Sequence, residues 1–351
     1  MYPGSYLYLD RLQVAIQGGM DLSNNPLHKT LISLQPQSGR RLQRPVAEAG
    51  RRQIWAQTRS ILESDIYKHR RYGEKRRRHW PLFDFSIRMF GMCLKTIGLY
   101  QRGYNNATRL VINSERIYFR DLPASFHGYT LLHLSDLHAD FISGCKNIIC
   151  DSLKNLSYDA CVMTGDYRAK ISGSIKGPME AMEEIISTIR ARDGIYATLG
   201  NHDTYQMADP LEKMGLTVLA NESIYVSRNN SRIQITGIDD PYYYYTDQSL
   251  TALEETTAGF KIALVHTPSL YDVAAENGYQ LYLCGHTHGG QICLPGGHPI
   301  ILHLKHGRKY YRGLWRYRKM TGYTSQGCGT VGIPIRFNTV SEATLITLMK
   351  G

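Results

Sequence analysis

The chain has 351 residues, of which 42% are hydrophobic and 20% are charged, and its formal net charge at pH 7 is +11. This length suits one large domain with an extension or two domains, and the apolar fraction is ordinary for a globular protein with a buried core. The seven cysteines show no Cys-x-x-Cys spacing, which argues against a disulfide framework and for free thiols in a reducing compartment.

Residues 1–63 show the weakest periodic pattern of apolar and polar residues. Gly18-Gly19 and Asn24-Asn25-Pro26 interrupt any periodicity, so this part predicts a poorly ordered or helical extension with a short helix near 45–63. Its first residues lack the basic-then-apolar order of a secretory signal, and no stretch approaches the ~18 apolar residues of a spanning helix. We therefore expect a cytoplasmic protein, or one bound peripherally to the inner face of the membrane.

Residues 64–104 form a basic, amphipathic segment that we expect to lie near a membrane. Residues 66–78 hold seven Lys or Arg residues against one Glu. The stretch 80–100 that follows is apolar, aromatic and rich in methionine, but it is interrupted by Asp84, Arg88 and Lys95. Such a segment suits a helix at the headgroup boundary of an anionic membrane, where each cation contributes about 1 kcal/mol. The alternative is a helix that packs on the rest of the protein, with its charges in solvent.

From residue 105 onward, strand-like and helix-like patterns alternate. Residues 109–113 and 116–119 predict the first strands, on either side of a turn. Helical patterns follow at 178–189 and 207–214, between further apolar runs. This alternation predicts an α/β fold for residues 105–351.

Five short polar motifs follow the apolar runs. They are Asp136-Leu137-His138, Gly165-Asp166, Gly200-Asn201-His202-Asp203, His266 and Gly285-His286-Thr287-His288. Any one motif is weak, because such groups arise by chance as turn residues or satisfied loop histidines. Five in order are strong, because the carboxyl ends of strands are where α/β sheets place active sites.

A second basic segment, residues 305–319, follows the last motif. It holds seven Lys or Arg residues and no acid, interleaved with Tyr310, Tyr311, Trp315 and Tyr317. Basic and aromatic side chains can bind nucleic acid, a nucleotide or a lipid phosphate. Because the segment lies close to the motifs in sequence, we expect it to handle substrate, and we regard nucleic acid as the less favoured partner.

The order and spacing of the motifs resemble the calcineurin-like metallophosphoesterases, in particular a phosphohydrolase-like branch that ends Gly-His-Thr-His-Gly-Gly-Gln, here residues 285–291. The resemblance covers residues 128–350. It implies a four-layer sandwich, in which two facing mixed β-sheets are flanked by helices. The catalytic domain would then span residues 105–351.

The resemblance also implies a dinuclear metal centre. It assigns one divalent ion to Asp136, His138, Asp166 and His288, and the other to Asp166, Asn201, His266 and His286. Asp166 then bridges two ions, which can lower the pKa of a water between them. Oxygen and imidazole ligands suit Mn, the preferred metal, and also Mg, Fe or Zn.

The catalytic residues that the resemblance implies are His202 and Asp203. His202 would act as a general acid toward the leaving group or bind the phosphoryl charge, and Asp203 could orient its imidazole. Two further features distinguish this chain. Arg168 and Lys170 follow Asp166, either to meet a substrate phosphate or as part of a solvated loop, and residues 242–245 form a run of tyrosines that could line a pocket.

These expectations predict a phosphoesterase that hydrolyses a phosphodiester or pyrophosphate bond. Because of the segment 64–104 and the segment 305–319, the preferred substrate is membrane-associated, a nucleotide-lipid such as UDP-diacylglucosamine. One alternative is a nuclease or a cyclic-nucleotide phosphodiesterase. Another is a peripheral membrane or nucleic-acid binding module whose metal site has decayed, which the intact set of seven ligands disfavours.

Overall fold

The computed structural model describes residues 46–72, 80–255 and 257–351, without the side chains of residues 46–49 and 65–84. Two of the sequence predictions therefore lie partly outside the described residues. They are the poorly ordered stretch before residue 46 and the side chains of the basic cluster at 66–78.

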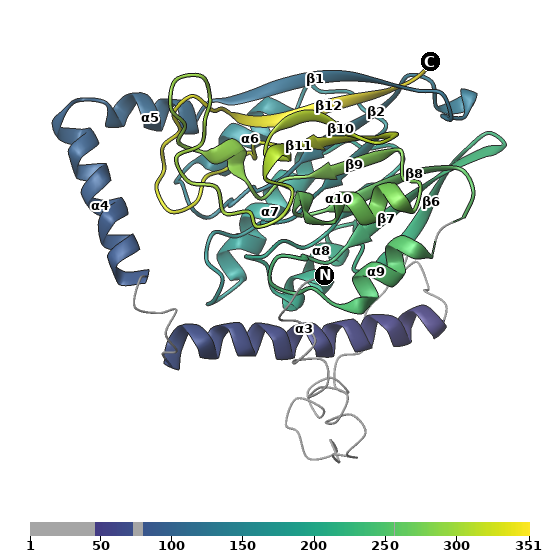
Figure 1. Ribbon diagram of the computed structural model, residues 1–351, viewed down its shortest axis with the longest axis horizontal. Helices are drawn as coiled ribbons and strands as arrows, with labels where there is room; N and C mark the ends of the chain where they lie inside the picture. The colour runs from purple at the N-terminus through teal and green to yellow at the C-terminus, as the bar shows by residue number, and fades with distance from the viewer. Residues whose placement is uncertain (1–45, 73–79, 256) are drawn as a thin grey trace, which may run out of the picture. The chain divides into compact units, whose positions relative to one another are not determined.

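The described chain begins with three helices and ends with a strand, and further helices lie between its strands (Figure 1). The α-helices are α3 (Val46–Tyr72), α4 (Trp80–Thr96), α5 (Tyr100–Ala107), α6 (Cys145–Leu153), α7 (Lys176–Thr188), α8 (Ala208–Lys213), α9 (Asp247–Glu254) and α10 (Tyr271–Glu276). Short 3-10 turns are η2 (Ala124–Phe126), η3 (Tyr205–Met207), η4 (Pro268–Leu270), η5 (His288–Gly290) and η6 (Arg308–Tyr310).

The strands form two six-stranded mixed sheets. Sheet 1 has the order β1 (Leu110–Phe119), β12 (Ser341–Lys350), β2 (Tyr129–Leu134), β3 (Ala160–Met163), β4 (Ile195–Ala197), β5 (Leu216–Val218). Sheet 2 has the order β10 (Gly313–Tyr317), β11 (Met320–Thr324), β9 (Leu281–Cys284), β8 (Phe260–Val265), β7 (Ser231–Ile238), β6 (Glu222–Arg228). The strands β2 to β5 are parallel, as are β7, β8, β9 and β11.

The two sheets face each other across a shared apolar core. Leu131 and Val162 of sheet 1 belong to the same buried cluster as Ile262 and Leu283 of sheet 2. The outer face of sheet 1 packs on α6, α7 and α8, and the outer face of sheet 2 packs on α9 and α10. Because both faces of the central parallel strands are buried, strands such as β3 and β9 are apolar throughout. The predicted four-layer α/β sandwich is confirmed (Figure 1).

Two elements differ from the sequence prediction. Residues 110–119 form one strand, not two strands around a turn, because β1 pairs in parallel with β12 along its whole length. The helix predicted near 45–63 extends to Tyr72 as α3. Trp55 and Arg59 of α3 are buried, so this part of the predicted extension packs on the sheets within one compact unit, Gly50–Gly351.

The predicted free thiols are confirmed among the described residues. All seven cysteines are free, and five of them are buried. Within residues 46–72, 80–255 and 257–351, none of the helices is long and apolar enough to cross a membrane.

Candidate metal centre

The five predicted motifs all lie at the carboxyl ends of strands. Asp136 and His138 follow β2, Asp166 follows β3, and Asn201 follows β4, all in sheet 1. His266 follows β8, while His286 and His288 follow β9, both in sheet 2. Since these strands are parallel within each sheet, their polar ends meet at one edge of the sandwich.

The first group of side chains contains Asp136, His138 and His288. Their ligand atoms lie within 4.8 Å of one another, and all three residues are buried. Nε2 of His138 is 3.2 Å from Nε2 of His288, which in turn is 3.4 Å from Oδ1 of Asp136. Two imidazole nitrogens and a carboxylate oxygen therefore converge on one point.

The second group contains Asp166, His266, His286 and Asn201. Oδ1 of Asn201 is 2.8 Å from Nδ1 of His286 and 3.0 Å from Nε2 of His266. Oδ2 of Asp166 is 3.3 Å from Nε2 of His266. The same Oδ2 is 3.8 Å from Nε2 of His138 in the first group, so Asp166 lies between the two groups.

The backbone around these side chains is strained. Asp136, His138, Asp166, His286 and His288 have φ values of 49°, 37°, 60°, 71° and 50°, in the left-handed region that non-glycine residues seldom adopt. Such strain persists only where the surroundings fix it, and it concentrates at functional sites. Gly165 and Gly200 allow two of the loops to approach, because a Cβ on Gly165 would lie 2.4 Å from the Gly200 nitrogen.

Backbone carbonyl groups fix the tautomers of three of the histidines. His138 Nδ1 donates to the Arg168 oxygen at 2.8 Å, His266 Nδ1 to the Thr164 oxygen at 2.7 Å, and His286 Nε2 to the His303 oxygen at 2.9 Å. Because the outer nitrogen donates to a carbonyl in each ring, the inner nitrogen is the atom that faces the centre. This is the arrangement by which proteins orient histidine ligands of metals.

Burial and mutual contact shift the pKa values of the groups at this site. Burial lowers the pKa of His138 and of His286 to about 3, so both rings are neutral. Burial also opposes charge on Asp166, but the neighbouring His266 and His202 outweigh it and hold the Asp166 pKa well below its ordinary value. For His266 the nearby Asp166 outweighs the effect of burial and raises the pKa to about 10.

These observations fit two divalent ions. The lone pairs of the neutral His138 and His288 imidazoles, whose Nε2 atoms are 3.2 Å apart, repel unless a cation lies between them. The ligand types also match, since carboxylate, amide and imidazole groups suit hard-to-borderline divalent ions. The seven residues predicted as ligands are thus brought together in two groups of suitable chemistry.

His202 lies beside the two groups, and its ligand atom is within 4.8 Å of those of His138 and Asp166. Its backbone N–H donates to Oδ1 of Asp166 at 2.8 Å, and its ring centre is 5.0 Å from that of His138. Its Nδ1 faces the Ala169 oxygen at 2.6 Å. Because Nδ1 is engaged, Nε2 is the atom of His202 left to meet a substrate.

The predicted hydrogen bond from Asp203 to the His202 imidazole is wrong. The Asp203 carboxylate accepts from the backbone N–H groups of Asp166, Tyr167 and Gly200, at 2.8 to 2.9 Å. The physical reason is that Asp203 is buried beneath the loop, where three amide donors would otherwise lack a partner. Asp203 joins the loop after β3 to the loop after β4, and a backbone carbonyl takes its predicted role at His202.

Arg168 was predicted either to meet substrate or to lie in solvent, and it does neither. It is 3% exposed, and its guanidinium donates to the backbone oxygens of His202, Ile171 and Gly173. It therefore stabilises the loop, while Lys170 is exposed. Tyr242 agrees better with the predicted pocket wall, because its ring centre is 4.5 Å from that of His286.

The segment 305–319 contacts the last motif through its backbone. Thr287 Oγ1 donates to the Tyr311 oxygen at 2.5 Å. Two of its aromatic residues, Tyr310 and Trp315, are buried and stack on each other with ring centres 4.3 Å apart. These two rings pack inside the protein and so do not contribute to the base-stacking surface that the sequence suggested.

Three residues near the centre were missed by the sequence analysis. Arg336 is fully buried and donates to the oxygens of His288, Gly327 and Gly329. Asp240 is buried near His266, and burial raises its pKa to about 6. Arg59 donates to the oxygens of Gly200 and Asp203. None belongs to a local motif, so only the folded structure identifies them.

Comparison with known proteins agrees with the geometry. Residues 129–290 match the family model described as calcineurin-like phosphoesterase. The uncharacterized metallophosphoesterase YkoQ of Bacillus subtilis is 28% identical over 74% of this chain and 98% of its own length. The phosphodiesterase YaeI of Escherichia coli is 25% identical over 68% of this chain and 88% of its own length. A Danio rerio protein named as a transmembrane protein with metallophosphoesterase domain is 30% identical over 65% of this chain and 55% of its own length.

Proposed function

We propose that this chain, whose residues 129–290 match the calcineurin-like phosphoesterase model, is a member of that family. It is a metal-dependent phosphoester hydrolase, and we propose that it cleaves a phosphodiester or pyrophosphate bond with two divalent ions. One observation carries the proposal. Two groups of imidazole and carboxylate ligands converge at one sheet edge, with Asp166 between them. A bridging carboxylate is the feature that separates a dinuclear from a mononuclear site.

We assign a separate chemical role to each residue of the site. Asp136, His138 and His288 would hold one ion, Asn201, His266 and His286 would hold the other, and Asp166 would bridge them. Mn is the metal we propose. When bound, such ions polarise phosphoryl oxygens and lower the pKa of a water molecule. His202 contributes the proton that a poor leaving group needs, from Nε2, while the Ala169 oxygen holds Nδ1 and keeps the ring in place.

The proposed substrate is a diester or pyrophosphate attached to a lipid, of the nucleotide-lipid class that includes UDP-diacylglucosamine. Support comes from the branch motif at residues 285–291 and from the aromatic ring of Tyr242 beside His286, which suits a flat or apolar part of a substrate. Support also comes from helix α4, described next. A cyclic nucleotide or an oligonucleotide is the competing substrate class.

Helix α4 has apolar side chains on two opposite faces. On one face Ile87, Gly91 and Leu94 pack toward Ile333, and Leu94 is 6% exposed. On the other face Phe85, Met89 and Met92 are 60%, 44% and 51% exposed. A water-facing helix surface is normally polar, so an apolar one requires a partner.

We propose an anionic membrane surface as the partner of this second face. Arg88 and Lys95, seven positions apart, lie on a strip of α4 that flanks the exposed apolar face, and both are exposed. Cations beside an apolar strip favour anionic headgroups with the apolar residues below them. The Danio rerio relative with a transmembrane name supports membrane proximity only by analogy.

Two assays test the proposed function. Purified full-length protein is first stripped with a chelator and then supplied with Mn, Mg or Zn, and bis-p-nitrophenyl phosphate turnover is measured. Turnover should depend on the added ion and disappear after chelation. A panel of nucleotide-lipid, cyclic nucleotide and oligonucleotide substrates follows. Faster turnover of cyclic nucleotide or oligonucleotide than of every nucleotide-lipid would overturn the lipid proposal, and no turnover of any phosphoester with any ion would overturn the whole.

A further inference from the structure

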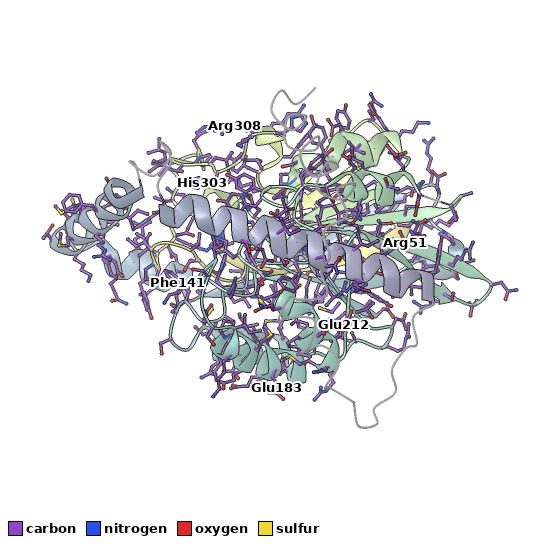
Figure 2. The ribbon with its side chains drawn as sticks, turned by 90° about the horizontal axis from the view of Figure 1, so that it is seen from below. Arg51, Phe141, Glu183, Glu212, His303 and Arg308 are labelled. Carbon is purple, nitrogen blue, oxygen red and sulfur yellow. The ribbon has the colours of Figure 1, made fainter. Side chains whose placement is uncertain are left out.

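We infer that Arg59 of helix α3 is a positioning residue for the metal-binding loop that carries Asn201 and His202. The inference rests on the proposed function for the role of that loop. Arg59 lies outside the residues that match the family model, yet it is 1% exposed and lies at the ends of strands β4 and β7. Figure 2 shows α3 running across the molecule, with the labelled Glu212 on one side and His303 and Arg308 on the other.

One half of the Arg59 guanidinium holds the loop after β4. Its Nη2 donates to the backbone oxygens of Gly200 and Asp203, at 3.0 Å each. These carbonyl groups flank Asn201 and His202 in sequence. Because both ends of the short loop are held by one planar group, the two side chains between them have a fixed direction.

The other half of the guanidinium reaches the second sheet. Its Nη1 pairs with Oδ1 of Asp239, which directly follows β7. Trp55 of α3 donates to the other oxygen of the same carboxylate, at 2.7 Å. The neighbouring Asp240 is buried near His266, so the contact lies next to the ligands of sheet 2. One side chain therefore joins the end of β4 to the end of β7.

Glu63 extends this contact by one turn of the helix. It accepts from Nε of Arg59 at 3.0 Å, from Thr204 Oγ1 at 2.6 Å and from the Tyr205 backbone N–H at 2.8 Å. The Tyr244 ring lies 3.4 Å from the guanidinium carbon of Arg59. The loop from Gly200 to Tyr205 is thus held along its length by two residues of α3.

These contacts need an arginine. A guanidinium presents its donors in a rigid plane, so it can serve two carbonyl groups and two carboxylates at once. Lysine has one charged nitrogen on a flexible stem and can replace only part of this set. Residues that orient ligands without touching the metal typically change metal affinity by 10–100-fold when replaced.

The test measures metal binding by full-length protein, without substrate. Mn²⁺ titration by calorimetry and by electron paramagnetic resonance is done on the wild type, Arg59→Lys, Arg59→Gln and the control Arg51→Gln. Arg51 is on the same helix, but its pair with Glu255 is exposed. In the Arg59 variants the ion assigned to Asn201, His266 and His286 should bind at least about tenfold more weakly, while the other ion should bind as in the wild type. Arg51→Gln should match the wild type at both ions.

Turnover of bis-p-nitrophenyl phosphate at saturating Mn²⁺ provides the second measurement. We expect kcat of Arg59→Lys to fall and KM to change little, because His202 and Asn201 lose their direction while the rest of the site is kept. Wild-type binding of both ions by Arg59→Lys would overturn the inference, and so would equal weakening of both ions. If the Arg59 variants do not fold, Glu63→Gln and Thr204→Val decide the question in the same way, with the same expected loss at one ion only. A wild type that binds two ions but hydrolyses no phosphoester would contradict the proposed function and leave the Arg59 inference standing.

Discussion

At the scale of single residues, Asp166 has an unusual position because it lies within reach of both groups of metal-binding side chains. Its Oδ2 is 3.3 Å from His266 and 3.8 Å from His138. We expect Asp166→Asn to lower the content of both ions, each by about 10–100-fold in affinity, because the shared negative charge is lost. Elemental analysis after gel filtration measures the content. Asn201→Ala is the matched control and should lose one ion, and an Asp166→Asn protein with two ions and normal turnover would show that Asp166 does not bridge.

His202 should act on the chemical step without holding a metal. We expect His202→Ala to keep both ions and to slow cleavage of a substrate with a poor leaving group by ~10²–10⁴. With p-nitrophenol as the leaving group the loss should be smaller, because this group departs without a proton. Steady-state rates on the two substrate types make the comparison. Equal losses on both would indicate electrostatic binding of the phosphoryl group by His202 in place of proton transfer.

The sequence identified residues whose role is set locally. His138 and His286 could be predicted because each lies in the short segment just after a buried strand, and the strand end determines its place. Asp203 was predicted as a catalytic residue that orients His202, but its carboxylate accepts from backbone groups, because these hydrogen bonds depend on how the loops after β3 and β4 meet. Arg59 could not be found at all, because its partners Asp239 and Gly200 are distant in sequence.

At the scale of elements, the exposed apolar face of helix α4 leads to a prediction about membrane binding. Replacement of Phe85, Met89 and Met92 by serine should reduce co-sedimentation with vesicles of anionic lipid by at least about tenfold, because burial of one such side chain contributes about 1.5–3 kcal/mol. Ile54→Ser with Ile61→Ser is the control, since these residues are 52% and 53% exposed on α3. Turnover of bis-p-nitrophenyl phosphate should stay unchanged in both sets.

Salt separates the two contributions to this binding. The attraction of Arg88 and Lys95 should weaken as the Debye length falls from ~10 Å at 0.1 M to ~3 Å at 1 M salt, while apolar burial persists. Vesicle binding should therefore decrease with salt but not vanish. Full-length protein that ignores anionic vesicles at low salt would contradict the proposed role of α4.

Strand β1 illustrates what local patterns cannot determine. Asn113-Ser114 has the composition of a turn, and the sequence analysis divided the segment there. In the fold Asn113 pairs with Thr344 and Ser114 with Leu345, so the partner strand holds these residues extended. The strands β2, β3, β8 and β9 were easier to predict, because a strand buried on both faces is apolar throughout.

At the scale of the whole molecule, a histidine buried between the two sheets makes the free energy of unfolding depend on pH. His133 of β2 is fully buried there, and burial lowers its pKa to about 3. The unfolded chain binds a proton near pH 6.5, whereas the folded protein does not, so its stability is full above that pH and decreases below it. The loss is about 1.4 kcal/mol per pH unit until the folded pKa is reached.

Urea unfolding at pH 7.5 and pH 5.5 tests this effect. His133→Gln keeps a partner for Thr164, which is 2.9 Å from the imidazole, but cannot take up the proton. The variant should lose about 1 kcal/mol less stability than the wild type between the two pH values. The same loss in both proteins would mean that His133 is not responsible.

The place of β12 in sheet 1 affects how the protein is made in the cell. β12 lies between β1 and β2, and Leu110 pairs with Ser341. A ribosome synthesises the chain from its N-terminus. β1 and one edge of β2 therefore lack their partner strand until β12 has been synthesised. A strand edge left open for that time can pair with another nascent chain, and distant pairing also slows folding. Yield in a cell should therefore depend on translation speed and on chaperones that shield the open edge.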